Sequence, residues 1–127
     1  MQSLISATPC FPVADVGATI GWYREYLGFS ANPFPDSEPY EFAILYRENA
    51  EIMLQYLKDY EKPNIYDRRP GGIWDAYFRM IGVREFYESI RNRLNVMRPL
   101  EKMPYPQIEF EVKDPNGYVL VFSETAE

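Results

Sequence analysis

The chain has 127 residues, enough for one domain with a hydrophobic core or for two small halves that share one. Hydrophobic residues make up 46% and aromatic residues 17%, against 25% charged residues, and this composition excludes a disordered chain. The formal net charge is −6 and the isoelectric point is about 4.7. Nucleic acid is therefore not an expected partner, because phosphate binding requires a basic surface.

The acidity itself has two interpretations. Excess carboxylates keep a small protein soluble, and they also favour cationic ligands. No apolar run is long enough to cross a bilayer, and Met1–Ser6 lacks the basic and apolar parts of a signal peptide. We therefore expect a cytoplasmic protein that does not contact a membrane.

The sequence contains no histidine, and Cys10 is its single cysteine. This excludes an internal disulfide and a cysteine-based metal site, and it removes the commonest metal ligand and the commonest general base at neutral pH. Cys10 could act as a nucleophile. Without a histidine to activate it, a buried structural thiol is the stronger interpretation.

The clearest element is a helix from Val16 to Leu27. Asp15 precedes it as the expected N-cap, because its carboxylate can accept from the free N–H groups of the first turn. Gly28 is expected to take the left-handed conformation after the last turn, with Phe29 folded back onto the helix. The apolar side chains share one helical face, at Val16, Ile20, Tyr23 and Leu27.

A second helix is expected from Val83 to Leu94. Its apolar residues have the same spacing, and Asn95 stands where Gly28 stands after the first helix. A repeat of roughly 60 to 70 residues is longer than the usual solenoid period, so this pattern indicates a duplicated module. The apolar positions in question are Val83, Tyr87, Ile90 and Leu94.

The remaining segments favour strands. Pro9 and Pro12 predict that the first strand lies at a sheet edge or is irregular there, because proline cannot donate to a ladder. Residues 30–39 predict a loop or an irregular strand, and residues 97–106 a short strand or a loop. Strands are expected at Leu4–Val13, Tyr40–Tyr46, Glu51–Leu57, Ile73–Met80, Ile108–Val112 and Tyr118–Phe122.

The last hairpin has the strongest turn signal in the chain. Proline pre-sets φ and Asn-Gly supplies positive φ in Asp114–Gly117. The strand before it alternates, with Ile108, Phe110 and Val112 on one face and Glu109 and Glu111 on the other.

Each half of the chain therefore predicts a strand, a helix and about three strands. The modules span about residues 4–57 and 73–124, and residues 58–72 are polar, contain proline and glycine, and are the expected linker. The predicted fold is α+β: two βαβββ modules whose sheets form a concave cleft within one domain of residues 1–127.

Three stretches carry a resemblance to a known family: VADVGATIGWYREYLGF, MIGVREFYESIRNRL and VKDPNGYVLVFSE. The chain resembles the vicinal oxygen chelate superfamily, whose fold is that of glyoxalase I, extradiol dioxygenases and bleomycin resistance proteins. The stretches ATPCFPVADV, AILYRENAEIMLQYL and IWDAYFRMIGVREFY are most similar to the bleomycin resistance branch. This fold hosts many chemistries, so the resemblance is specific for fold and weak for function.

Enzymes of that superfamily bind a divalent metal through side chains on four strands. The resemblance places these ligand positions at Thr8, Gln55, Asp75 and Val121. Valine cannot ligate a metal, and threonine and an amide are weak neutral donors. We therefore expect no functional metal, no cofactor and no catalytic residue, with Gln55 and Asp75 as weak metal candidates.

Asp75, Tyr77 and Arg79 alternate along one predicted strand, so their side chains should share a face. An ion pair between Asp75 and Arg79 and a role of Asp75 in ligand binding are both open.

The aromatic residues are too numerous for the core of so small a domain. They indicate either ordinary core and dimer interface or a stacking platform for a flat or cationic ligand. The resemblance implies a homodimer that holds a drug without changing it chemically. We expect these residues near the ligand: Phe42, Gln55, Tyr56, Trp74, Asp75 and Tyr77.

The leading hypothesis is thus a bleomycin-resistance-like protein of antibiotic resistance, which sequesters an aromatic or cationic small molecule. The first alternative is a metal-dependent lyase or dioxygenase of the same superfamily, with a site around Gln55 and Asp75. The second is a structural or interaction subunit, which a cleft filled by its own aromatic side chains would favour.

Overall fold

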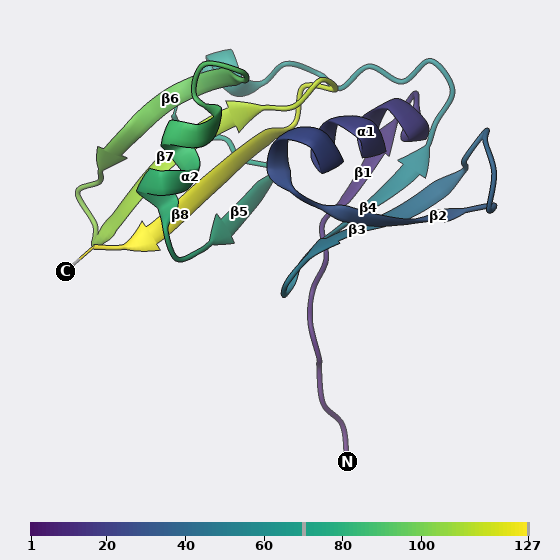
Figure 1. The fold of residues 1–127 in the computed structure, drawn as a ribbon, viewed down its shortest axis with the longest axis horizontal. Helices are drawn as coiled ribbons and strands as arrows, with labels where there is room; N and C mark the ends of the chain where they lie inside the picture. The colour runs from purple at the N-terminus through teal and green to yellow at the C-terminus, as the bar shows by residue number, and fades with distance from the viewer. Residues whose placement is uncertain (70, 127) are drawn as a thin grey trace. The chain divides into compact units, whose positions relative to one another are not determined.

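The structure, a computed structural model, describes residues 1–69 and 71–126. The chain forms two compact units, Met1–Tyr60 (unit 1) and Glu61–Glu127 (unit 2). Each unit contains a strand, a helix and three further strands in that order, as Figure 1 shows. The predicted fold of two βαβββ modules is confirmed.

Unit 1 is a four-stranded sheet with one helix. The sheet order is β1-β4-β3-β2, with β1 parallel to β4 and the other neighbours antiparallel. The first strand lies at the edge, as Pro12 within it and Pro9 just before it predict. The elements are β1 (Cys10–Val13), α1 (Val16–Leu27), β2 (Ser30–Phe34), β3 (Phe42–Arg47) and β4 (Ala50–Tyr56).

Unit 2 repeats this topology. Its sheet order is β5-β8-β7-β6, with β5 parallel to β8, and a 3₁₀ turn η1 (Tyr66–Arg68) precedes the sheet. The elements are β5 (Ala76–Arg79), α2 (Val83–Ile90), β6 (Asn95–Lys102), β7 (Gln107–Lys113) and β8 (Val119–Thr125).

The first helix forms as its sequence predicts. Asp15 accepts a hydrogen bond from the Ala18 N–H at 2.9 Å, and Gly28 is left-handed with φ 71°. Phe29 is buried and meets the Tyr23 ring edge-on, with the centroids 5.8 Å apart. This helix therefore has both caps within its own segment.

The prediction for the second helix is wrong at its C-terminal end. α2 ends at Ile90, and Asn95, expected as a left-handed cap, opens β6 and pairs with Lys113. Pairing of β6 with β7 therefore overrides the local helical pattern beyond Ile90. At the other end, Glu124 of β8 accepts from the N–H groups of Gly82 and Val83 at 3.0 Å each.

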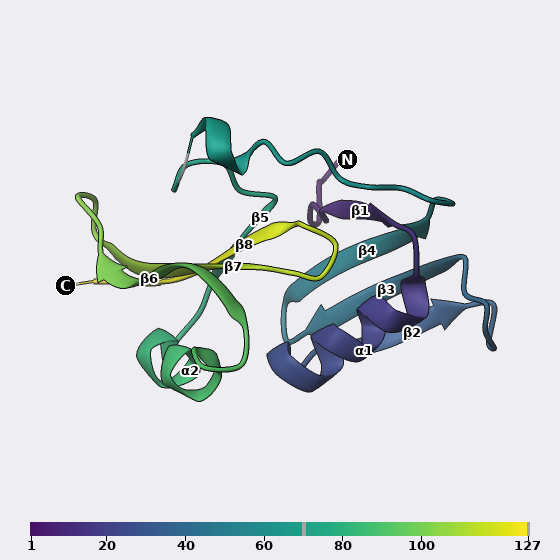
Figure 2. The ribbon, with the colours of Figure 1, turned by 90° about the horizontal axis from the view of Figure 1, so that it is seen from above.

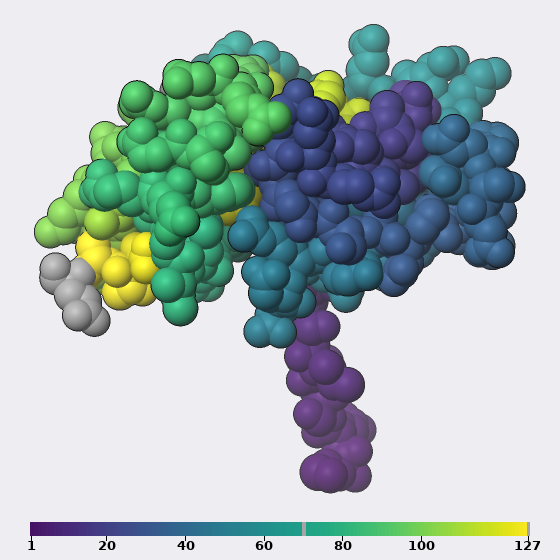
Figure 3. All heavy atoms as spheres, in the orientation of Figure 1, coloured from purple at the N-terminus to yellow at the C-terminus, as the bar shows by residue number. Residues whose placement is uncertain are grey.

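Two predictions for the first strand need correction, namely its start and the burial of Cys10, which is exposed. The first strand begins at Cys10 and not at Leu4: Leu4 and Ile5 are 99% and 96% exposed, and the segment before β1 extends away from the sheet of unit 1 (Figures 1 and 3). A segment without pairing partners stays outside the ladder whatever its strand propensity. β2 and β6 are strands where a loop was the alternative, and β6 has register shifts against β7 between Val96 and Arg98 and between Arg98 and Glu101.

One face of each sheet packs against its helix. In unit 1 the buried side chains Ala43, Leu45, Ile52 and Leu54 lie on the side of α1. In unit 2 the rings of Phe110 and Phe122 pack against α2. Figure 2 shows the segment that contains η1 on the opposite face of the unit 2 sheet. The faces away from the helices are where the two units differ.

The final turn has the predicted geometry. Gly117 has φ 93°, and Asp114 accepts from the N–H groups of Asn116 and Tyr118 at 2.8 and 2.9 Å. The alternation in β7 is confirmed, and both of its faces are buried. This turn sets the register between β7 and β8.

Candidate functional site

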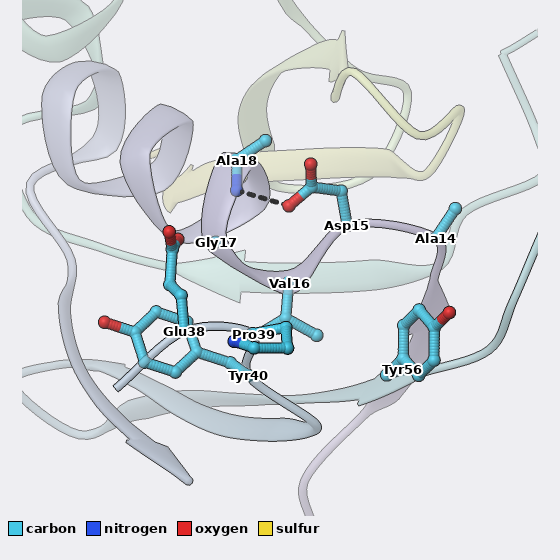
Figure 4. A pocket seen from close by; sticks show the side chains of 9 residues that line it. All are labelled: Ala14, Asp15, Val16, Gly17, Ala18, Glu38, Pro39, Tyr40 and Tyr56. Carbon is cyan, nitrogen blue, oxygen red and sulfur yellow. Dashed lines mark hydrogen bonds between the residues drawn. The ribbon is translucent and has the colours of Figure 1, made fainter. Parts of the chain in front are cut away.

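Unit 1 contains a pocket of about 560 Å³ beside the N-terminus of α1 (Figure 4). It is formed by the start of the helix, the loop between β2 and β3, and the end of β4. Its lining residues are Ala14, Asp15, Val16, Gly17, Ala18, Glu38, Pro39, Tyr40 and Tyr56. We call this the helix pocket.

The helix pocket is acidic and aromatic. Asp15 and Glu38 provide two carboxylates, Tyr40 and Tyr56 provide two rings, and no lysine or arginine is among the lining residues. Asp15 uses one carboxylate oxygen to cap Ala18, as the dashed line in Figure 4 shows. Such a lining favours a positively charged group, through the carboxylates and the ring faces.

Gly17 makes room for one of these carboxylates. A Cβ atom built on Gly17 would overlap Oε1 of Glu38, whereas one on Gly21 would meet nothing within 4 Å. The missing side chain thus lets Glu38 lie against the first turn of α1, where the helix dipole stabilises negative charge.

The sheet of unit 1 also has an open face, opposite α1. Phe42 and Gln55, both predicted ligand residues, are cross-strand partners there, and Phe34 beside Phe42 is 62% exposed. Tyr56, the next residue after Gln55, points to the other side of the sheet and lines the helix pocket. Unit 1 therefore separates Tyr56 from Phe42 and Gln55.

The face of unit 2 away from α2 contains two buried carboxylates. Glu109 and Glu111 lie on β7, a central strand, and both are fully buried. A carboxylate at such a position is stable only with hydrogen-bond donors around it. We call these two residues and their donors the carboxylate network.

Arg98 of β6 links the two carboxylates. It donates to Oε1 of Glu109 at 3.0 Å from Nη2 and to Oε2 of Glu111 at 2.9 Å from Nε, and Nη2 also forms an ion pair with Oε2 of Glu111 at 2.7 Å. The Tyr66 hydroxyl and the Trp74 indole N–H each donate to Glu111 at 2.9 Å. Every oxygen of Glu111 thus accepts at least one hydrogen bond.

Glu109 accepts from two tyrosines. The hydroxyls of Tyr77 and Tyr105 donate to its two oxygens at 2.6 Å each. Burial and these hydrogen bonds raise the pKa of both tyrosines above the ordinary range, and burial with the bond to Glu111 raises the pKa of Tyr66. The network therefore keeps these phenols protonated to a higher pH than in the unfolded chain.

Trp74 and Tyr77, two predicted ligand residues, are brought together by this network. Their ring centroids are 5.3 Å apart. Cationic side chains lie over neighbouring rings: Arg79 is 5.4 Å from the Tyr77 centroid and Lys113 is 6.0 Å from that of Tyr66.

Asp75, between them in sequence, has a different set of contacts. Its carboxylate accepts from the Val119 N–H at 2.8 Å and pairs with Lys62 at 3.4 Å. Its cationic neighbour is thus Lys62, whereas Arg79 lies over Tyr77.

The carboxylate network was not identified from the sequence. The alternation of β7 placed Glu109 and Glu111 on one face, but their donors come from positions 4 to 45 residues away. The sequence gives no signal for the burial of Glu109 and Glu111, because a central strand of an antiparallel sheet can keep one face in water, as β3 does. The helix pocket was not identified from the sequence either, because Glu38 lies in a loop whose sequence has no recognisable motif.

Comparison with known protein families identifies the fold. Residues 6–122 match the model of the glyoxalase, bleomycin resistance protein and dioxygenase superfamily. The chain belongs to this superfamily. No curated protein matches the chain.

Solved structures of the same fold cover almost the whole chain. TioX from Micromonospora sp. ML1 is 17% identical with a TM-score of 0.72, over 97% of this chain and 98% of that one. A bleomycin-binding protein from Streptomyces verticillus, complexed with copper(II)-bleomycin, is 18% identical with a TM-score of 0.65, over 100% and 99%. The bleomycin resistance determinant of transposon Tn5 is 20% identical with a TM-score of 0.71, over 96% and 98%.

The positions that the resemblance assigns to metal ligands hold poor donors at Thr8, Gln55 and Val121. The Thr8 hydroxyl donates to Glu51 at 3.2 Å, Gln55 lies on the open face of unit 1, and Val121 is fully buried. Within residues 1–69 and 71–126, no group of three or more His, Cys, Asp or Glu residues is arranged to hold a metal. The helices of the described chain are too short or too polar to span a membrane.

Proposed function

We propose that the chain binds a small aromatic or cationic molecule, such as a drug or an antibiotic, and sequesters it without metal-dependent chemistry. The observation that carries this proposal is the helix pocket, with its two carboxylates, two tyrosine rings and no basic residue. Two proteins of the same fold are described by their binding of bleomycin or resistance to it, which supports the ligand class.

A cation gains from this lining in two ways. A positive charge about 4 Å from a surface carboxylate gains up to a few kcal/mol, and salt weakens that gain. A ring face adds about 0.5–1 kcal/mol at an exposed site. The pocket volume of about 560 Å³ lies within the range of small-molecule sites.

The proposal includes a homodimer, as the family resemblance implies. Sedimentation equilibrium of the purified chain measures this directly, and a monomer at micromolar concentration would remove the dimer from the proposal while leaving the pocket.

The first test is calorimetric titration with metal-free bleomycin, repeated at raised salt. We expect about one drug per subunit and weaker binding at high salt. Glu38→Gln should raise Kd about tenfold, because it removes one of the two pocket charges. Asp36→Asn is the matched control: it changes the same charge in the same loop, outside the lining, and should leave Kd within about twofold.

A pair of glycine variants tests the pocket without touching its charges. Gly17→Ala displaces Glu38 and should weaken bleomycin binding, while the helix loses little or no stability. Gly21→Ala in the same helix meets no neighbour, so it should raise the free energy of unfolding by up to about 1 kcal/mol with unchanged affinity. Equal affinities of the two variants would contradict the pocket.

Metal analysis separates this proposal from the enzymatic alternative. Tightly held, stoichiometric metal in protein purified without chelator would favour a lyase or dioxygenase and would overturn the proposal. Absence of heat with bleomycin and with simple cationic aromatic compounds would overturn it as well.

A further inference from the structure

Three aromatic side chains of unit 2 are fixed by their polar ends. Trp74 donates to Glu111, while Tyr77 and Tyr105 donate to Glu109, and both carboxylates are fully buried. The polar atoms of these rings are therefore directed at the sheet. Trp74 and Tyr105 are nonetheless 38% and 39% exposed. A ligand would therefore contact mainly the carbon atoms of these rings. We call Trp74, Tyr77 and Tyr105 the ring platform.

The carboxylates beneath the ring platform are not available to a cation. Each oxygen of Glu109 and Glu111 already accepts from a guanidinium, phenol or indole donor. A ligand ammonium group would have to displace one of these buried donors, which would then lose its partner, at a cost of about 1–3 kcal/mol.

Positive charges of the chain already occupy the surroundings. Arg79 lies over the Tyr77 ring and Lys113 lies over the Tyr66 ring, whereas the two carboxylates offset the charge of Arg98. A cationic ligand would meet the like charges of Arg79 and Lys113. An uncharged flat ring avoids this repulsion and gains from stacking on aromatic surfaces that are held in place.

We propose that the ring platform binds a flat ring system that carries no positive charge, with Glu109 and Glu111 as positioning residues. This inference rests on the proposed function in one respect only, that the chain binds small molecules. It assigns to unit 2 a ligand class different from that of the helix pocket, where carboxylates without basic neighbours favour a cation.

Two bicyclic probes of nearly the same size test the assignment. 4-Quinolone is uncharged at neutral pH, and 4-aminoquinoline is a cation. The chain has two tryptophans, so NMR shows two indole N–H signals, and Trp22→Phe assigns them. We expect 4-quinolone to shift the Trp74 signal at a lower concentration than 4-aminoquinoline does, and to leave the Trp22 signal in place.

Variants of Tyr105 separate the contribution of its ring to binding from that of the hydrogen bond that holds the ring in place. Tyr105→Leu removes the ring and should raise the Kd of 4-quinolone about tenfold, since stacking on one ring contributes about 1–3 kcal/mol. Tyr105→Phe keeps the ring and removes only the bond to Glu109, and should raise Kd about threefold. Unchanged affinity in Tyr105→Leu would overturn the platform.

Carboxylate variants test the positioning role. Glu109→Gln should weaken 4-quinolone binding about threefold or more and broaden the Trp74 signal, while the affinity for 4-aminoquinoline at the helix pocket stays unchanged. The matched control is Glu101→Gln, an exposed carboxylate that also contacts Arg98, and it should have no effect on either probe. Equal effects of the two variants would overturn the role of Glu109.

The outcomes distinguish the two proposals. If only 4-aminoquinoline binds and Glu38→Gln weakens it, the ring platform is wrong and the proposed function stands. If 4-aminoquinoline shifts the Trp74 signal more readily than 4-quinolone does, the assigned ligand class is wrong. If neither probe nor bleomycin binds, both proposals fail.

Discussion

The two units share one topology and differ on the sheet face away from the helix. In unit 1 that face presents Ile44 and Tyr46 from β3, and it is open. In unit 2 the equivalent strand, β7, presents Glu109 and Glu111, and other side chains bury both. The helix-facing side specifies the βαβββ fold in each unit, so the other side is free to take on different chemistry.

Burial of charge explains why unit 2 needs more chain than unit 1. Two carboxylates inside a sheet require several donors, and the strands supply only Arg98 and Tyr77. The segment before β5 adds Tyr66 and Trp74, and the loop after β6 adds Tyr105. The open face of unit 1 has no such requirement, because its carboxylate Glu51 is exposed.

The largest expected effect on the free energy of unfolding comes from removing a buried carboxylate of unit 2, Glu111. Glu111→Ala removes the acceptor of Tyr66 and Trp74 and one of the two buried carboxylates paired with Arg98, and should lower the free energy of unfolding by about 3–5 kcal/mol. Urea unfolding followed by circular dichroism measures this. Glu51→Ala, an exposed carboxylate of unit 1, should change it by about 0.5 kcal/mol or less. A loss below about 1 kcal/mol for Glu111→Ala would contradict the role of the network.

A smaller effect compares the two helix caps. Asp15→Ala removes one hydrogen bond at the start of α1 and should cost about 1 kcal/mol. Glu124→Ala removes two at the start of α2 and should cost about 1–2 kcal/mol. Thermal unfolding of both variants measures the difference, and an unaffected Glu124→Ala protein would show that α2 needs no cap from β8.

The smallest expected effect is a fall in the free energy of unfolding at alkaline pH. Burial and hydrogen bonds to the network raise the pKa of Tyr66, Tyr77 and Tyr105 in the native state, whereas a tyrosine in the unfolded chain titrates near pH 10. Above about pH 10 the unfolded chain has therefore lost protons that the native state keeps, and the free energy of unfolding falls as the pH rises. Below that pH the stabilisation is fully present.

Urea unfolding at about pH 9 and about pH 11 measures this fall. Tyr105→Phe has no titrating group at that position in either state, so its fall between the two pH values should be smaller than that of the natural chain. A fall of equal size in both proteins would remove Tyr105 from the pH dependence.

Elements whose signals are local were predicted well from the sequence. Asp15 and Gly28 bound α1 from within its own segment, and Asp114–Gly117 forms its turn from its own residues. The end of α2 was missed, because pairing of Asn95 with Lys113 depends on a strand further along the chain. Local pattern does not report such a partner.

For the same reason, the candidate site was predicted only in part from the sequence. Of the predicted ligand residues, Tyr56 lines the helix pocket, and Trp74 and Tyr77 share the carboxylate network. Glu109 and Glu111 were seen only as an alternating pair, since burial of that face depends on side chains up to 45 residues away. Their fully buried state follows from tertiary structure alone.

The cap of α2 by Glu124 has a consequence for synthesis of the chain on the ribosome. Glu124 is 41 residues beyond Val83, the first residue of the helix. At a translation rate of about 5–20 residues per second, α2 waits about two to eight seconds for its cap after its own first residue is made. Over that interval α1 already has both of its caps, so unit 1 can complete its helix while unit 2 is still being translated.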